Sequence, residues 1–124
     1  MVKLNSNLKE LIETIISGIN NVKGDDIRLL NFEKIDNSIC SYFILCSGTS
    51  NTHVNAISGS IKKNVSKKIK EKPYHVEGLE NLEWVLLDYV NVVVHVFQKH
   101  VREFYDLESL WGDAKVKKIA SNYQ

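Results

Sequence analysis

The chain has 124 residues, of which 44% are hydrophobic and 25% are charged, and its formal net charge is +1. This balance is typical of a single globular domain and excludes a disordered chain. The apolar stretches fall far short of the roughly 18 consecutive apolar residues that a membrane-spanning helix needs. The first residues lack both a secretory apolar core and an Arg-rich transit pattern, so we expect a cytoplasmic, soluble protein.

The N-terminal segment predicts an amphipathic helix followed by a strand. Asn7 and Glu10 fit a capping box at the start of the helix, and Asn20, Asn21 and Gly24 fit its end. The apolar residues of this segment recur at helical spacing: Leu8, Leu11, Ile12, Ile15, Ile16 and Ile19. Residues 26–32 then have the composition of a short strand.

The middle of the chain predicts a buried strand, a turn and a long helix. Residues 41–47 form a nearly continuous apolar run, which fits a strand buried on both faces. The Ser47-Gly48-Thr49-Ser50 turn leads into a helix from Asn51 to about Glu71, with one apolar face and an opposite face rich in lysine. Pro73 prevents this helix from continuing.

The final third predicts a hairpin and another helix. Residues 84–89 and 92–98 read as two strands joined at Val90-Asn91, and residues 101–111 return to helical spacing. With one further short strand before the hairpin, the order predicts a single α/β domain with a mixed sheet of about five strands flanked by helices. We place the core at about residues 5–115 and a basic tail at 116–124.

The sequence offers little for metal or nucleophilic chemistry. Its two cysteines and four histidines show no zinc-ligand spacing, so we expect no metal and no cofactor. Cys40 and Cys46 fall in one predicted strand, roughly 20 Å apart, too far for a disulfide. His95, between two valines, is expected to be a structural histidine.

The Ser47–Ser50 turn could bind a phosphate group at a helix N-terminus. Phosphoryl transfer would also require carboxylates to hold magnesium, and residues 37–70 contain neither Asp nor Glu. We therefore interpret the turn as a helix cap and expect no enzyme activity.

Charge is distributed unevenly along the chain. Residues 57–75 carry six lysines against Glu71 alone, whereas residues 76–113 carry eight acidic residues against Lys99 and Arg102. The lysines alternate with an apolar stripe, which favours a solvated helix face over an RNA-binding surface. The acidic segment also holds Trp, Tyr and Arg, the residue types that most often supply binding energy. An acidic field around aromatic anchors suits a basic protein partner.

Several blocks of the chain form a distinctive pattern. They begin with Ser41-Tyr42-Phe43-Ile44-Leu45-Cys46-Ser47-Gly48-Thr49-Ser50 and the His53-Val54-x-Ala56-Ile57 that follows. They continue with Glu77-Gly78, Glu83-Trp84-Val85-Leu86-Leu87-Asp88-Tyr89, the strand at 92–97 and Arg102-x-Phe104-Tyr105-x-Leu107-Glu108-x-Leu110-Trp111. Together these blocks closely resemble the ribosomal silencing factor family (RsfS/Iojap), and the two C-terminal blocks are the most specific in order and spacing.

The resemblance implies a nucleotidyltransferase-like α/β fold without known transferase activity. It also implies a bacterial protein that docks on ribosomal protein uL-fourteen of the large subunit, sterically blocks subunit joining and lowers translation when nutrients fall. Some members form homodimers. The hypothesis for this chain is therefore a non-enzymatic anti-association factor. We expect its docking surface to be formed or supported by Trp84, Asp88, Tyr89, Arg102, Tyr105, Glu108 and Trp111.

The chain departs from the family pattern at the hairpin turn. Where the family usually has a turn that contains glycine, this chain has Tyr89-Val90-Asn91, and we expect Asn91 to take the left-handed position. Two alternative functions stay open: a nucleotidyl or phosphoryl transferase that uses the Ser-Gly turn, and an RNA-binding module that uses the lysine-rich helix to contact ribosomal RNA.

Overall fold

The protein was analysed as a computed structural model that describes residues 2–35, 40–110, 112 and 114–119, with side chains from residue 7 onward in these ranges. Its elements are α1 (Val2–Asn21), β1 (Asp25–Asn31), β2 (Tyr42–Gly48), α2 (Asn51–Ile69), β3 (His75–Glu77), β4 (Trp84–Asp88), β5 (Val92–Gln98), α3 (Lys99–Tyr105), α4 (Leu107–Leu110) and β6 (Lys115–Ile119). None of the described helices combines the length and apolarity needed to cross a bilayer.

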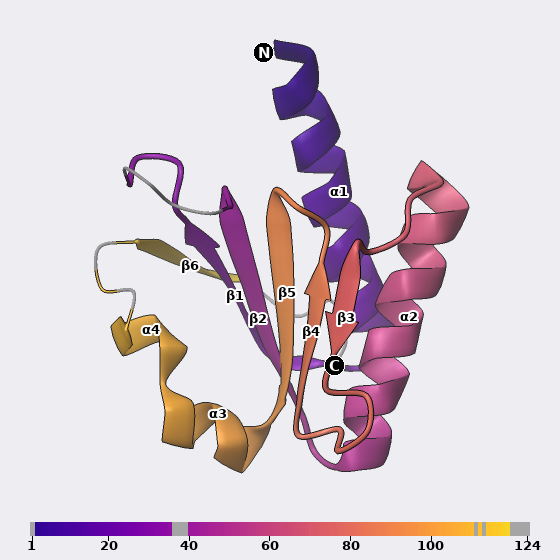
Figure 1. The fold of residues 1–124 in the computed structure, drawn as a ribbon, viewed down its shortest axis with the longest axis vertical. Helices are drawn as coiled ribbons and strands as arrows, with labels where there is room; N and C mark the ends of the chain where they lie inside the picture. Colours follow the sequence, from indigo (N-terminus) through magenta and orange to yellow (C-terminus); the bar gives the residue numbers. More distant parts are fainter. Residues whose placement is uncertain (1, 36–39, 111, 113, 120–124) are drawn as a thin grey trace.

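The strands form one mixed sheet in the order β3-β4-β5-β2-β1-β6 (Figure 1). Strands β2 and β5 run parallel, and the other described neighbours run antiparallel. The predicted α/β class and mixed sheet are confirmed. Strand β2 is buried along nearly its whole length, as its apolar run predicted.

The predicted strand count was one too low. Residues 115–119 pair with β1, from Ile27 opposite Ile119 to Asn31 opposite Lys115, so these residues are an edge strand and not part of a tail. The strand could not be predicted from its sequence, Lys-Val-Lys-Lys-Ile, because a mostly exposed edge strand needs no alternation of apolar and polar residues. Lysines also protect such an edge from pairing with other chains. Residues 120–124 lie outside the described part.

Helices α1 and α2 cover one face of the sheet, and α3 and α4 lie on the other (Figure 1). The α1 stripe and the apolar face of α2 pack onto that first face in the larger core. A smaller core lies on the second face and includes Phe43, Phe97 and Leu107. Because the second face has less helical cover, it leaves side chains of β4 and α3 accessible.

Two predicted helix boundaries were wrong. Helix α1 begins at Val2, ahead of the proposed cap at Asn7. The segment expected as one helix over 101–111 is instead α3 and α4, separated by Asp106 in the left-handed conformation at φ 47°. The amide of Asp106 still donates to the carbonyl oxygen of Arg102 at 2.9 Å, which closes α3.

The hairpin between β4 and β5 is confirmed, but the prediction for its turn was wrong. The left-handed residue is Val90, at φ 77°, and not Asn91. The Asn91 amide donates to the Tyr89 carbonyl oxygen at 3.0 Å, and the Val90 amide donates to the Asp88 carboxylate at 2.7 Å. A three-residue turn centred on a β-branched residue with positive φ is strained.

Candidate functional site: an aromatic surface beside a buried arginine

Three aromatic side chains from two elements form one continuous group on the less covered face of the sheet. The ring centroids of Trp84 and Tyr105 are 4.9 Å apart, and those of Tyr105 and Phe104 are 5.1 Å apart. Phe104 is 81% exposed and Tyr105 is 52% exposed, whereas Trp84 is half-buried. We call Trp84, Phe104 and Tyr105 the aromatic surface.

Trp84 is held in place on several sides. Its ring lies 4.9 Å from that of Phe97 and packs against Tyr105, and its indole Nε1 donates a hydrogen bond of 3.0 Å to His95 Nδ1. His95 is 4% exposed, so it is buried and hydrogen-bonded, as expected. Burial lowers the pKa of His95 to about 4, which keeps the imidazole neutral at physiological pH.

Each residue of the aromatic surface has an exposed acidic neighbour in the chain. Glu83 precedes Trp84, Glu103 precedes Phe104, and Asp106 follows Tyr105. An exposed apolar group with an acidic margin is suited to a partner that is apolar at the centre of the contact and basic around it.

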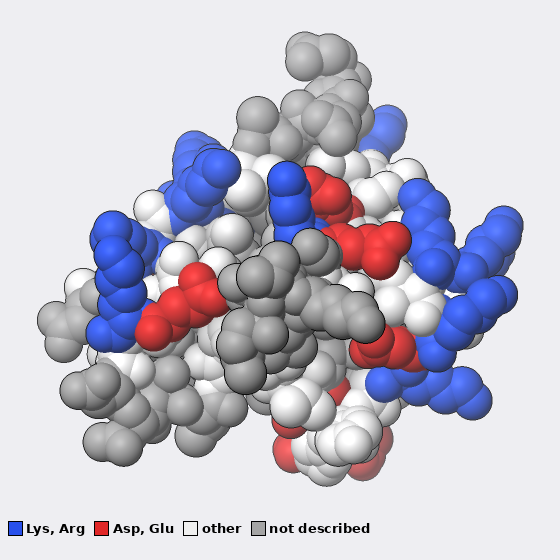
Figure 2. All heavy atoms as spheres, turned by 90° about the horizontal axis from the view of Figure 1, so that it is seen from above, with Lys and Arg blue, Asp and Glu red and all other residues white. Residues whose placement is uncertain are grey.

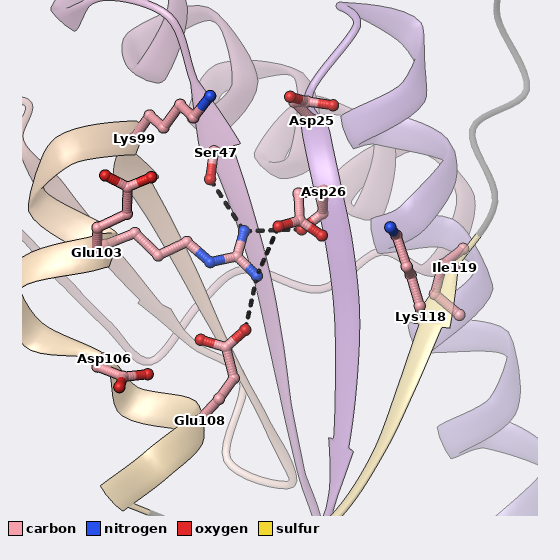
Figure 3. Close-up of a pocket in the computed structure, with 10 residues that line it drawn as sticks. Asp25, Asp26, Ser47, Lys99, Glu103, Asp106, Glu108, Lys118 and Ile119 are labelled. Atoms are coloured by element: carbon pink, nitrogen blue, oxygen red, sulfur yellow. Dashed lines mark hydrogen bonds and ion pairs between the residues drawn. The ribbon is translucent and has the colours of Figure 1, made fainter.

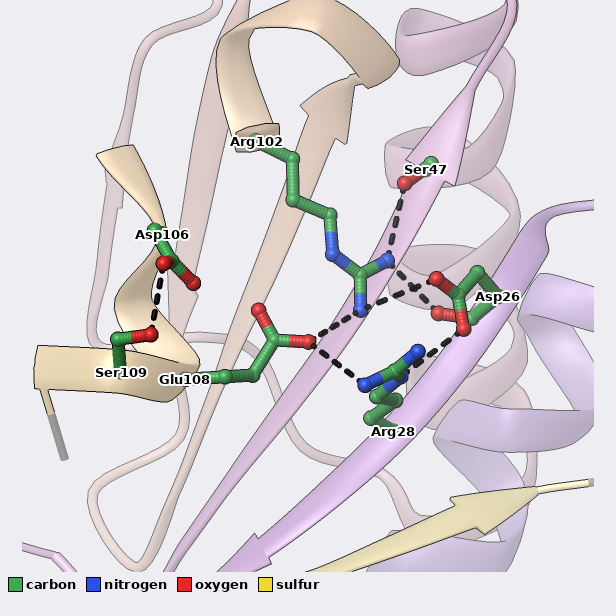
Figure 4. Close-up of polar contacts among 7 residues, drawn as sticks. All are labelled: Asp26, Arg28, Ser47, Arg102, Asp106, Glu108 and Ser109. Carbon is green, nitrogen blue, oxygen red and sulfur yellow. Dashed lines mark hydrogen bonds and ion pairs between the residues drawn. The ribbon is translucent and has the colours of Figure 1, made fainter. Parts of the chain in front are cut away.

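Arg102, beneath this surface, is turned into the protein. It is 6% exposed, and it donates to the Asp26 carbonyl oxygen at 2.7 Å, to Ser47 Oγ at 2.9 Å and to the Glu108 carboxylate at 3.1 Å (Figure 4). Arg28 pairs with the same Glu108 at 3.4 Å. The guanidinium therefore ties α3 and α4 to β1 and β2, and it holds the helix that carries Phe104 and Tyr105.

The carboxylate of Asp26 completes this network. Its partial burial would raise the pKa, but the hydrogen bond from Arg28 and the charges of Arg102 and Arg28 outweigh that effect and hold the pKa below its ordinary value. Asp26 therefore stays ionised over the physiological range and neutralises the buried guanidinium.

The structure places the other predicted site residues apart from the aromatic surface. Asp88 lies four residues along β4 from Trp84, roughly 13 Å at 3.3 Å per residue, and its carboxylate caps the Val90 turn. Tyr89 is 5% exposed and belongs to the core under α1 and α2. Trp111 lies outside the described residues. Trp84 and Tyr89 lie on opposite faces of the sheet, as the alternation of side chains along a strand requires.

A cleft of about 800 Å³ adjoins Arg102 (Figure 3). Its walls include Asp25, Lys99, Glu103 and Lys118, so both charge signs are interspersed. Among the described residues, no group of three or more His, Cys, Asp or Glu is arranged to hold a metal ion. The Arg102 guanidinium in this cleft already contacts protein acceptors.

The Ser47–Ser50 turn uses its polar groups within the protein. Ser50 caps α2 by accepting a hydrogen bond from the His53 amide at 3.1 Å, as predicted. The Thr49 amide donates to His53 Nδ1 at 2.9 Å, and His53 Nε2 bonds to the Val22 carbonyl oxygen at 2.8 Å. Ser47 Oγ accepts from Arg102. These contacts weaken the transferase hypothesis because they occupy groups that would bind phosphate.

Neither cysteine has the character of a nucleophile. Both are free and buried, and burial raises the pKa of Cys40 to about 11 and that of Cys46 to about 12. A thiol with such a pKa is protonated at neutral pH and reacts slowly.

The docking surface expected from the sequence did not include Phe104, which is 81% exposed. Leu110 on α4 was treated in the same way and is 69% exposed. The segment at 101–111 holds five apolar or aromatic side chains besides Val101, and their number did not show which of them would be exposed once the segment divided into two short helices.

Residues 5–124 match the family model described as "Ribosomal silencing factor during starvation". The chain belongs to the ribosomal silencing factor family. A relative named "Ribosomal silencing factor RsfS" from Halalkalibacterium halodurans is 38% identical over 106 residues, which cover 86% of this chain and 89% of the relative. A crystal structure of a protein from Chromobacterium violaceum has a TM-score of 0.78 and 34% identity, covering 92% of this chain and 94% of that chain.

A more distant relative comes from mouse and is named "Mitochondrial assembly of ribosomal large subunit protein 1". It is 35% identical over 72 residues, which cover 56% of this chain and 32% of that protein. The resemblance noted from the C-terminal blocks is therefore confirmed. Ribosomal silencing factors are regulatory proteins associated with the ribosome and are not known enzymes.

Proposed function

We propose that this protein represses translation by docking on the large ribosomal subunit in the bacterial cytoplasm and sterically preventing the small subunit from joining. The single observation that supports docking most is the aromatic surface: Phe104 and Tyr105 are exposed, Tyr105 contacts both Phe104 and Trp84, and Trp84 is held by Phe97 and His95. Rigid aromatic anchors with an acidic margin fit a basic ribosomal protein, and the family resemblance points to uL-fourteen.

The predicted docking residues divide into two groups in this proposal. Trp84 and Tyr105, together with Phe104, meet the partner. Arg102 and Glu108 support the surface by fixing α3 and α4 against the sheet. Asp88 is proposed as a second contact at the far end of β4, and Tyr89 supports that strand from the opposite face.

The docking surface is tested by pelleting purified bacterial large subunits with the protein. Phe104→Ala and Trp84→Ala should each weaken binding about thirtyfold, the loss expected for a central aromatic anchor. Tyr74→Ala is the comparison variant for the far end of β4, because Tyr74 is 84% exposed, against 81% for Phe104, and its amide donates to the Asp88 carbonyl oxygen; it should weaken binding less than Phe104→Ala does. If Tyr74→Ala weakens binding and Phe104→Ala does not, the docking surface lies at the other end of β4.

In addition to the contacts of the aromatic surface and Asp88, we propose a contact between the lysine-rich face of α2 and ribosomal RNA. Figure 2 shows basic side chains gathered on the side of the molecule formed by α2. The exposed lysines of this region are Lys63, Lys67, Lys68, Lys70 and Lys72. Within the part of the chain that the structure describes, none of them forms an ion pair, so their charges are available to phosphates.

This RNA contact has a distinct signature in salt. Each phosphate contacted contributes a slope of about −0.7 to −0.9 to log K against log salt. Lys63→Gln with Lys67→Gln should therefore reduce the salt slope of large-subunit binding by about two, whereas Phe104→Ala should leave the slope unchanged. Equal slopes for wild type and the double lysine variant would contradict the proposed RNA contact. They would not affect the proposal that the aromatic surface docks on the large subunit.

A further inference from the structure

Trp84, the half-buried residue of the aromatic surface, has its only polar side-chain atom turned inward. The indole Nε1–H can act only as a donor, and it donates to His95 Nδ1 at 3.0 Å. His95 Nδ1 must therefore carry no proton. In a neutral imidazole the proton then lies on Nε2, so this one contact sets the tautomer of His95.

His95 is poorly suited to its own surroundings. It lies on β5, its ring centroid is 4.4 Å from that of Phe43, and its ring stacks at 6.0 Å on Phe97. Its Nε2 is buried and has no hydrogen-bond partner among the described residues. A buried donor without an acceptor is destabilising, and an apolar side chain here would avoid that cost.

The indole contact is the one polar role that the structure gives to His95. The contacts of Trp84 with Phe97 and Tyr105 are tilted ring contacts at 31° and 50°, between the offset-stacked and edge-to-face arrangements that aromatic pairs prefer, and they do not involve the indole nitrogen. They fix where the indole lies but not which of its edges faces outward. The hydrogen bond to His95 decides this, because it keeps the N–H edge inside.

We propose that His95 is a positioning residue that orients Trp84 so that only the hydrocarbon edge of the indole is offered to the partner. The partner then recognises Trp84 by apolar contact, without a hydrogen bond to the indole nitrogen. This inference deepens the proposed function and rests on the aromatic surface as the docking site. It adds that the part of the partner that contacts Trp84 is apolar.

The orientation is tested first without the ribosome. The chain contains two tryptophans, so a ¹⁵N-labelled sample gives two indole N–H signals in an NMR spectrum, and Trp84→Phe identifies the Trp84 signal. That signal should be slow to exchange with solvent in wild type. In His95→Leu it should shift and exchange quickly, because the indole must turn to reach water. An unchanged, slowly exchanging signal in His95→Leu would overturn the proposal.

Docking is then measured with purified bacterial large subunits. His95→Leu should weaken binding about 3- to 10-fold, the value of one hydrogen bond. It should add nothing to the loss already caused by Trp84→Phe. His95→Asn places an amide oxygen near the Nδ1 position and should recover most of the wild-type affinity even where it unfolds more easily. A merely structural histidine would show the reverse: affinity would follow stability in every variant.

The outcomes separate the two proposals. If Trp84→Phe weakens docking and His95→Leu changes it less than twofold, the positioning role of His95 is wrong and the docking surface stands. If Trp84→Ala and Phe104→Ala both leave docking unchanged, the aromatic surface itself is wrong, whatever the NMR spectrum shows.

Discussion

Arg102 of α3 donates a hydrogen bond of 2.7 Å to the carbonyl oxygen of Asp26, which lies 76 residues earlier in the chain. Through this contact a short helix that could not be stable alone is fixed against β1. The same guanidinium bonds Ser47 on β2 and Glu108 on α4. The aromatic surface therefore depends on a buried charge network for its placement.

Removing Arg102 should destabilise the fold. Arg102→Ala leaves the Asp26 carbonyl oxygen and Ser47 Oγ without their donor and leaves Asp26 and Glu108 with Arg28 alone as a cation, so we expect a loss of about 2–4 kcal/mol in the free energy of unfolding. Arg28→Ala is the control, because the Arg28 side chain is 34% exposed against 7% for Arg102; it should cost less than about 1 kcal/mol. Urea unfolding of both variants checks this, and equal losses would contradict the role given to Arg102.

Strain at the hairpin turn should be relieved by glycine. Val90 has φ 77°, and a β-branched residue in that region costs about 1–3 kcal/mol. Glycine removes this strain, but it also raises the conformational entropy of the unfolded chain, which offsets part of the gain. We expect Val90→Gly to stabilise the protein by about 1 kcal/mol. Val116→Gly offers the same substitution at matched exposure, 46% against 47%, but within strand β6, where it should destabilise. Thermal unfolding should give opposite signs for the two variants.

Two glycines should respond oppositely to alanine. A Cβ at Gly78, where φ is +92°, would lie 2.0 Å from the carbonyl oxygen of Trp84, whereas a Cβ at Gly59 on α2 meets nothing within 4 Å. Gly78→Ala should cost more than about 2 kcal/mol and displace Trp84, and Gly59→Ala should gain about 0.5–1 kcal/mol. Unfolding curves measure both changes. A tolerated Gly78→Ala would show that the 78–84 loop adjusts freely.

The pKa of His95, lowered by burial to about 4, should make stability depend on pH. Above the unfolded value of about 6.5, neither state is protonated at this residue. As the pH falls from about 6.5 to 4, the unfolded chain takes up a proton that the folded protein does not, so the free energy of unfolding falls by up to about 3 kcal/mol. Below about 4 this contribution levels off.

Urea unfolding at several pH values checks this with His95→Leu as the reference. Carboxylates also titrate in the range, so the quantity of interest is the difference between wild type and His95→Leu. That difference should shift by up to about 3 kcal/mol in favour of the variant between pH 6.5 and 4. A difference that is independent of pH would mean that His95 titrates normally in the folded protein.

The sequence predicted the parts of the fold that are governed by burial. The apolar run of β2, the hairpin strands and the stripes of α1 and α2 all face a core, so their periodicity is visible. Strand β6 was missed because it is an exposed edge, held by backbone pairing with β1. The left-handed residue of the hairpin was misplaced because Val90 is β-branched, a residue type that rarely adopts positive φ; its conformation is accompanied by local hydrogen bonds to Asp88 and between Tyr89 and Asn91.

The candidate site was predictable in composition but not in orientation. Residue type selected Trp84 and Tyr105, but it also selected Tyr89, which lies in the core on the opposite face of the sheet. Nothing local to the sequence shows that Arg102 turns inward, since its partners Asp26 and Ser47 come from distant strands. The exposure of Phe104 likewise depends on where α3 rests on the sheet.

Subunit joining itself gives the most direct test of the central claim. Purified bacterial small and large subunits are mixed at a magnesium concentration that supports association, and light scattering follows the formation of whole ribosomes. Wild-type protein in excess should suppress the rise in scattering, and Phe104→Ala should require about thirtyfold more protein for the same suppression. Undiminished joining in a saturating excess of the wild-type protein would contradict the account.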